Sequence, residues 1–291
     1  MPALALAQLS FEQYEGYTTG VFSAGALIIR DGSAEITNLK SLDGAQSAWL
    51  LAESNGLSAQ WPYLPVAVTG NSAVSYLSWA IETPLSENEQ FYDFSADGAY
   101  IRLAQESGVL SMSVYDPTVV STDSEQPGQA YVVYSVELTS GQNWSRLTIR
   151  FDHQNGYCDF YVNGQIVAAD FPLVQGVTAL SIETTPGSEL YLDRMASLDQ
   201  PLDFADIDRD GLPDDWETAN SLAVGIVDRY SDKDGDGESN LLELMNGTDP
   251  AEGIGGATAN SEPLGGLTIF IAGRGFFTVN EQADRSPLVR K

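Results

Sequence analysis

The sequence predicts a mainly β chain in which an antiparallel two-sheet sandwich over residues 10–198 precedes a small acidic module with short helices and a C-terminal hairpin. Two observations predict the sandwich. Proline, glycine, asparagine and serine recur about every eight to fifteen residues, and the intervals hold short β-rich runs without a long helical period. About twelve such runs in roughly 190 residues are typical of two packed sheets. A domain of this size can bury its core without disulfides.

The expected strands follow one another closely along this region. They are Ala26–Ile29, Ala34–Ile36, Trp49–Ala52, Tyr76–Ile81, Tyr100–Leu103, Leu110–Tyr115, Tyr131–Leu138, Ser145–Phe151, Tyr157–Val162, Gln165–Ala168, Thr178–Ile182 and Glu189–Leu192.

The clearest local pattern lies in the last third of the sandwich region. One turn is expected at Gln154–Gly156 and a second at Asn163–Gly164, with a β-rich run on each side of both. Asparagine followed by glycine is a strong hairpin pattern because both residues tolerate positive φ. We therefore expect three consecutive antiparallel strands here.

The same segment carries a family resemblance. Asn143–His153 opens with a tryptophan, and Tyr157–Val167 contains Tyr-Val-Asn-Gly after a strand. This arrangement resembles laminin G-like, concanavalin A-like jelly-roll domains, and Phe11–Tyr17 is similar to the first strand of bacterial members. The resemblance implies a jelly-roll sandwich that binds sugars or proteins, or in some branches cleaves glycans.

Two twelve-residue loops in the acidic module share one spacing. Oxygen-bearing side chains stand at loop positions 1, 3, 5, 9 and 12, glycine stands at position 6, and position 7 would offer its backbone carbonyl. The candidate ligands are Asp206, Asp208, Asp210, Leu212, Asp214 and Glu217 in the first loop, and Asp232, Asp234, Asp236, Glu238, Asn240 and Glu243 in the second.

This spacing is the one that a hard cation with six to eight oxygen ligands requires. Residues 201–250 hold 14 of the 41 acidic residues of the chain and only three basic ones. So many carboxylates repel one another unless cations neutralise them. We therefore expect two Ca²⁺ sites, with calcium binding coupled to the folding of this segment.

The order of the loops also resembles a family. Asp210–Glu217, Asp234–Glu243 and the closing Asn246–Pro250 resemble, in that order, the thrombospondin type 3-like calcium repeats of bacterial secreted proteins. An EF-hand pair needs a long entering helix, which Pro201 interrupts. Dockerins also have paired calcium loops, but the helix after each dockerin loop is longer than the stretches that follow Glu217 and Glu243 here. A dockerin is therefore the second choice.

The resemblance implies a calcium module over residues 199–250 that rigidifies the C-terminal join of a secreted or cell-surface protein. We expect Asp206→Ala or Glu243→Ala to loosen this module and leave the sandwich folded.

The two ends of the chain leave alternatives open. Residues 1–9 are either the remnant of a signal peptide, with Ala5-x-Ala7 as its cleavage site, or a first strand. Residues 251–266 have the composition of a flexible linker. Residues 267–291 contain two β-rich runs, and a lone hairpin is marginal in water. It therefore packs on the sandwich of its own chain, begins a further domain, or pairs with another copy to form a homopolymer.

Composition argues against several classes of partner. The formal net charge of −28 argues against nucleic acid and anionic membranes, and no apolar run approaches the roughly 18–20 residues of a membrane span. The single cysteine, Cys158, excludes an intrachain disulfide. Its alternating surroundings predict a buried, inert thiol.

No enzyme motif stands out. The single histidine, His153, lies at a turn, and Glu87, Glu89 and Asp93 fall in an expected loop rather than in the Glu-x-Asp-x-Glu strand of related glycosidases. Phosphate-loop, metalloprotease and dinucleotide patterns are also missing from the sequence. We therefore expect no enzymatic activity.

Sugar binding would require exposed aromatic rings beside polar groups. Trp61 and Tyr63, which stand among prolines in an expected loop, are the candidate ligand-binding residues. Trp79 and Trp144 are expected in the core.

These observations predict a secreted or cell-surface, non-enzymatic, calcium-binding protein of adhesion or structure. Its sandwich would recognise a surface glycan or protein. Two alternatives remain: a carbohydrate-binding module that targets polysaccharide, and a self-assembling extracellular filament subunit that uses its C-terminal strand.

Overall fold

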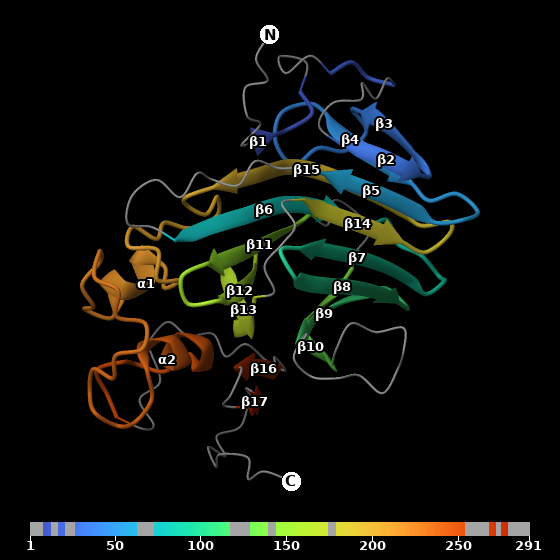
Figure 1. Cartoon of the computed structure of the whole chain (residues 1–291). Coiled ribbons are helices and arrows are strands. Elements are labelled where there is room, and N and C mark those ends of the chain that lie inside the picture. The colour runs from blue at the N-terminus through green and yellow to red at the C-terminus, as the bar shows by residue number, and fades with distance from the viewer. Residues whose placement is uncertain are drawn as a thin grey trace.

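Two β-sheets form the main body of the chain, and two short helices lie beside one end of the larger sheet (Figure 1). The computed structural model describes residues 8–12, 17–20, 27–62, 73–116, 129–138, 144–173, 179–253, 268–271 and 275–278. The expected mainly β, two-sheet jelly-roll sandwich is confirmed.

The larger sheet has ten strands, all antiparallel to their neighbours except β13 and β16. Its order is β17 (Gly275–Thr278), β16 (Thr268–Ile271), β13 (Gln165–Pro172), β12 (Tyr157–Val162), β11 (Ser145–Asp152), β6 (Val74–Glu82), β15 (Glu189–Leu198), β4 (Ser47–Leu51) and β3 (Ser33–Thr37), with β1 (Gln8–Leu9) also paired to β15.

The smaller sheet has seven strands. Its order is β10 (Gln129–Glu137), β9 (Val109–Asp116), β8 (Ala99–Glu106), β7 (Gln90–Ala96), β14 (Leu180–Thr184), β5 (Leu57–Trp61) and β2 (Ile28–Asp31).

The main hydrophobic core lies between the two sheets. Alternate residues of each strand point into it, as the pleat of a strand requires. Trp79 of β6 meets Phe94 of β7 across the interface, with ring centroids 5.5 Å apart. Cys158 of β12 is fully buried in this core, and burial raises the pKa of its thiol. The prediction of a buried thiol is therefore confirmed.

The hairpin pattern is also confirmed. β11, β12 and β13 are consecutive antiparallel strands. Asn163 and Gly164 join β12 to β13 with φ values of 51° and 80°, which is the double left-handed turn that suits the twist of a hairpin.

The twelve strands expected from the sequence are all present, with ends that differ by a few residues. The structure adds β5 and β7, which the sequence analysis did not identify, and β1 lies within residues 1–9, for which a first strand was one of the two alternatives. Asp93 was expected in a loop, and this was wrong, since it lies on β7. There it receives two hydrogen bonds from Arg102, both of 2.7 Å. Polar side chains at alternate positions of β5 and β7 face outward. They interrupt the apolar runs from which the other strands were predicted, so these two strands were not identified.

The segment with the two acidic loops packs on the outer face of the larger sheet, beside β11–β13 (Figure 1). It contains α1 (Asp214–Ala219) and α2 (Asn240–Asn246). A second hydrophobic cluster joins the two parts, and its buried members are Tyr161, Ile166, Ala169, Leu212, Leu241, Leu242 and Met245. Several strands of the larger sheet are consequently buried on both faces.

The C-terminal hairpin of β16 and β17 lies at the edge of the larger sheet. Phe270 and Ile271 of β16 pair with Ala168 and Ala169 of β13 in parallel. Of the three alternatives for this hairpin, the structure therefore has it on the sandwich of its own chain.

At the N-terminus, Gln8 and Leu9 form a short strand on β15. Residues 1–7 lie outside the described part, so the question of a signal peptide stays open. Phe11 and Glu12 belong to no strand, and residues 13–16 are outside the described part. Among the residues that the structure describes, no helix has the length and apolar character that a membrane span needs.

Candidate metal centre

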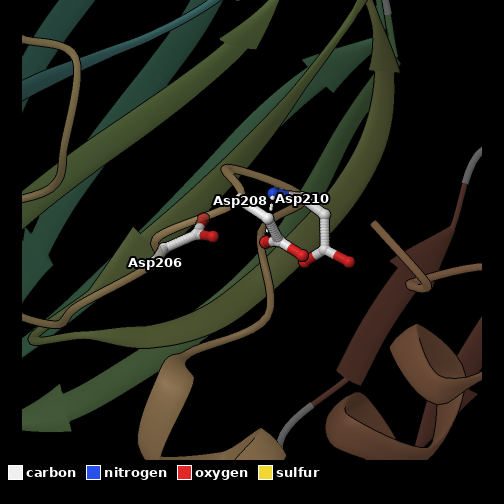
Figure 2. Close-up of side chains that lie close together, drawn as sticks. All are labelled: Asp206, Asp208 and Asp210. Atoms are coloured by element: carbon white, nitrogen blue, oxygen red, sulfur yellow. Dashed lines mark hydrogen bonds between the residues drawn. The ribbon is translucent and has the colours of Figure 1, made fainter. Parts of the chain in front are cut away.

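The first loop gathers three carboxylates at one point of the larger sheet. One oxygen from each of Asp206, Asp208 and Asp210 lies within 4.8 Å of the others (Figure 2). Gly211, at the sharp turn of the loop, has a φ of 96°, a conformation that glycine adopts without strain.

Three hydrogen bonds from backbone amides shape this loop. Gly211 N donates to Asp206 Oδ2 at 3.0 Å, Asp210 N to Asp208 Oδ1 at 3.3 Å, and Leu212 N to Asp210 Oδ1 at 2.8 Å. Each bond occupies one carboxylate oxygen. Asp206 Oδ1 and Asp208 Oδ2 are left buried without a hydrogen-bond partner among the described residues.

The second loop repeats this pattern. Gly237 N donates to Asp232 Oδ2 at 2.9 Å, Asp236 N to Asp234 Oδ1 at 3.1 Å, and Glu238 N to Asp236 Oδ1 at 2.8 Å. The three aspartates again lie within 4.8 Å of one another, although they are more exposed than those of the first loop. The equal spacing thus produces the same local geometry twice.

Glu217 closes the first loop from α1. Its side chain is fully buried, and neither carboxylate oxygen has a hydrogen-bond partner among the described residues. Burial, followed by the negative charges of Asp208 and Asp210, raises the pKa of Glu217 to about 8. A buried carboxylate of this kind needs a positive charge or hydrogen-bond donors.

Two other carboxyl groups of the loops also have raised pKa values. Burial and the charge of Asp210 raise the pKa of Asp208 to about 7. In the second loop, burial and the charge of Asp234 raise the pKa of Glu243, on α2, to about 7. Glu243 is 2% exposed, and its Oε2 has no partner in the described part of the chain.

The remaining predicted ligands are placed as follows. Asp214 Oδ1 accepts a hydrogen bond from Ile207 N at 2.8 Å. Glu238 Oε2 accepts one from Asn246 Nδ2 at 3.4 Å, and its expected role is through its backbone carbonyl, as for Leu212. Asn240 is fully buried and donates from Nδ2 to the carbonyl of Asp228 at 3.0 Å. Its amide is therefore held between the two loops.

Side chains of the sandwich hold the first loop directly. The Tyr76 hydroxyl donates to Asp206 Oδ2, Arg150 donates to the Arg209 carbonyl at 2.7 and 3.0 Å, and Tyr161 donates to the Gly211 carbonyl at 2.9 Å. All three contacts come from the outer face of the larger sheet.

A buried ion pair completes this junction. Arg229, between the two loops, binds Asp159 of β12 at 2.7 Å and also donates to the carbonyl of Asp210. Asp159 bonds at the same time to Arg150 at 2.9 Å. The sequence analysis did not identify these residues, because spacing along the chain does not show that a strand lies beneath the loop.

The aromatic candidates for sugar binding fare differently. Trp61 was expected to be an exposed platform, and this was wrong. It lies on β5 in the main core and is 1% exposed, because the strand places its ring on the inner face of the smaller sheet. Tyr63 lies outside the described residues. Trp79 is fully buried, as expected.

An open cleft of about 400 Å³ lies at one end of the smaller sheet. Gln60, Ser95, Tyr100 and Ser181 line it with the hairpin turn at Asp97. It combines an aromatic ring with several hydrogen-bonding side chains. Sequence reasoning missed it because its residues come from β5, β7, β8, β9 and β14.

His153 contacts a serine, which is a pair that also occurs in catalytic sites. Its Nε2 lies 3.0 Å from Ser75 Oγ. Among the described residues, no carboxylate accepts a hydrogen bond from this histidine, so nothing there orients its ring as in a catalytic triad. The absence of enzymatic activity stays a prediction.

No family model and no curated protein matches this chain. Among solved structures, a carbohydrate esterase from a Shiga toxin-encoding bacteriophage, phi24B, has 15% identity and a TM-score of 0.43 over 59% of this chain and 89% of that one. The binding domain of botulinum neurotoxin serotype G has 12% identity and a TM-score of 0.40, over 68% of this chain and 48% of the other. The receptor-binding domain of botulinum neurotoxin D has 14% identity and a TM-score of 0.38, over 60% and 45%. Less than half of each toxin domain is thus covered, and these distant likenesses assign no function to the chain.

Proposed function

We propose that this chain is a calcium-binding protein with one Ca²⁺ site in each acidic loop. The observation that carries the proposal is Glu217, at the end of a loop that already gathers three aspartates. Its carboxylate is fully buried, and neither oxygen has a hydrogen-bond partner in the part of the chain that the structure describes. Removing a carboxylate from water without compensation is costly. A bound cation would compensate all of these charges at once.

The donor set fits calcium. Every candidate ligand is an oxygen from a carboxylate, an amide or a backbone carbonyl, and Ca²⁺ takes six to eight such oxygens. Zinc and other softer metals prefer the nitrogen and sulfur ligands of histidine and cysteine. The single histidine and the single cysteine of the chain both lie on the sandwich, away from the two loops.

Calcium at the first loop would act on the junction with the sandwich. The ion would neutralise the carboxylates of the loop, including Asp206, which accepts a hydrogen bond from Tyr76. It would also order the loop backbone, whose carbonyls accept hydrogen bonds from Arg150 and Tyr161. Its binding free energy would then stabilise the larger sheet as well as the loop. On this proposal, loss of calcium from the first loop would lower the stability of the sandwich too. The sequence analysis expected instead that only the acidic module would loosen.

The test is calcium titration of the full chain by calorimetry, with thermal melts in calcium and in EDTA. Two bound ions are expected; Glu217→Gln should remove binding at the first loop, and Glu243→Gln should remove binding at the second. Asp215→Asn is the matched control, because Asp215 is an exposed carboxylate on α1 two residues from Glu217. A wild-type chain that binds no ion at millimolar calcium would refute the proposal.

At the level of biology, we propose an extracellular or cell-surface protein whose sandwich recognises a glycan or a protein in adhesion or structural assembly. Loops of this kind bind calcium with dissociation constants around 10⁻⁴–10⁻³ M in extracellular modules, which suits an environment rich in calcium. The strong negative charge supports a soluble partner or surface of neutral or positive charge.

A carbohydrate ligand is the second candidate, and the cleft at Tyr100 supports it. Sugars stack their apolar faces on aromatic rings and bond to neighbouring polar groups. Tyr100→Ala and Gln60→Ala should both abolish binding on a glycan array, whereas Ser111→Ala, on β9 outside the cleft lining, should not. Retained glycan binding in both cleft variants would exclude this location.

A homopolymer through residues 267–291 stays a prediction. Size-exclusion chromatography in calcium should show oligomers that disappear when these residues are deleted. The pairing of β16 with β13 of the same chain favours a monomer.

A further inference from the structure

Asp228 lies between the two loops and is held against the first. Its backbone amide and that of Arg229 both donate to Asp210 Oδ2 at 2.9 Å. Asp228 stands eleven residues after Glu217 and four before Asp232, so it belongs to neither twelve-residue loop. Its position is nevertheless set by a candidate ligand of the first one.

The carboxylate of Asp228 leaves one oxygen available. Its Oδ1 is buried and has no hydrogen-bond partner among the described residues. The charge of Asp228 is one of those that raise the pKa of Glu217, after burial and the charges of Asp208 and Asp210. Because the backbone amide of Asp228 donates to Asp210, its carboxyl group stands beside the first loop.

Several oxygens around the first loop are open to a cation. Among the described residues, Asp206 Oδ1, Asp208 Oδ2 and both oxygens of Glu217 are buried without a hydrogen-bond partner. Asp210 accepts hydrogen bonds from three backbone amides, which hold it in place. Asp228 Oδ1 is a further buried oxygen without a partner in this part of the chain, and Ca²⁺ takes six to eight oxygens.

Asn240 secures this arrangement from α2. Spacing assigns Asn240 to the second loop, yet its Nδ2 donates to the carbonyl of Asp228. The backbone amides of Asn240 and Leu241 also donate to the carbonyls of Ser231 and Arg229, each at 2.9 Å. The segment that carries Asp228 is thus tied to the helix that closes the second loop.

We propose that Asp228 is a ligand of the first calcium site, contributed from outside the twelve-residue loop, and that Asn240 is the positioning residue that holds it there. The inference rests on the proposed calcium function and adds a ligand that spacing does not reveal. It also makes the two sites dependent on each other, because the helix that carries Glu243 positions a ligand of the other site.

The experiment compares Asp228→Asn with Asp215→Asn in the full chain. Calcium is titrated by calorimetry, and Tb³⁺ is titrated by luminescence with tyrosine excitation, which reports on the first site because the Tyr76 hydroxyl touches Asp206. Asp228→Asn should weaken the first site by about tenfold or more and leave the second within about threefold. Asp215→Asn should change neither.

A further variant tests the role of Asn240. With the second site removed by Glu243→Gln, Asn240→Ala should still weaken the remaining site severalfold. An unchanged first site in Asp228→Asn would overturn the proposal while leaving the calcium function intact. An equal loss of thermal stability in EDTA and in calcium would also overturn it, because that is the result of a purely structural role. A wild-type chain that binds neither ion would remove the calcium function itself.

Discussion

Replacing Glu217 by glutamine is expected to stabilise the protein without calcium and to cancel or reverse that gain with calcium. The carboxyl group is fully buried, and its pKa rises from an ordinary 4.5 to about 8. Between these two pH values the folded chain holds a proton that the unfolded chain has released. Wild-type stability therefore falls as pH rises from about 4.5 to about 8, by about 1.4 kcal/mol per pH unit.

The raised pKa of Glu217 therefore lowers the free energy of unfolding of the wild type by about 3 kcal/mol at pH 7 and by about 4 kcal/mol at pH 8. Glutamine removes this loss of stability but buries an amide without partners, which costs about 1–3 kcal/mol. In EDTA at pH 8 we therefore expect Glu217→Gln to be more stable than wild type by about 1–3 kcal/mol. In 10 mM calcium, a site with a dissociation constant near 10⁻⁴ M adds about 2.7 kcal/mol to the wild type alone.

Urea denaturation at pH 6 and pH 8, in EDTA and in calcium, measures both effects. The advantage of the variant in EDTA should shrink at pH 6, where wild-type Glu217 keeps its proton in the folded state. Asp215→Asn should follow the wild type in all four conditions. A variant that is less stable than wild type in EDTA at pH 8 would show that Glu217 is not an uncompensated buried charge.

Three further predictions follow from the same region and the core. Burial and nearby carboxylates raise the pKa values of Asp208, Glu217 and Glu243 to about 7, 8 and 7. Calcium should therefore release protons when it binds at pH 6, and it should bind more tightly as the pH rises to 8. Calorimetry in buffers of different ionisation enthalpy measures the released protons, and a pH-independent affinity would contradict this expectation. Tyr76→Phe removes one of the two donors to Asp206 Oδ2 and should lower the stability of the whole sandwich by about 1–2 kcal/mol, in one cooperative transition; a separate, earlier transition of the loops would argue for an independent module. Cys158 is fully buried, so its thiol should react with Ellman's reagent only in denaturant, and fast reaction of the native chain would contradict its place in the core.

The strands that the sequence identified share a simple physical property. Runs such as Tyr157–Val162 are dense in β-branched and aromatic residues, and the Asn163–Gly164 turn allows only a few backbone conformations. Strands with polar residues at alternate positions, such as β5 and β7, gave a weaker pattern. Trp61 was assigned to a loop for this reason, although its strand buries it in the core.

The two acidic loops could be read from the sequence because their geometry is local. Amides two to five residues along the loop donate to each aspartate, and glycine permits the turn. Spacing alone therefore determines which carboxylates converge, and it does so twice in this chain.

Only the tertiary structure decided what surrounds those loops. Tyr76, Arg150 and Tyr161 come from three strands that the sheet places side by side beneath the first loop. Asp228 reaches Asp210 because the chain folds back between the loops. The sequence by itself determined most of the strands, the hairpin turns and the convergence of each aspartate cluster, since these depend on neighbours along the chain. The burial of Glu217 and the junction with the sandwich depend on residues far apart in sequence, and packing alone brings them together.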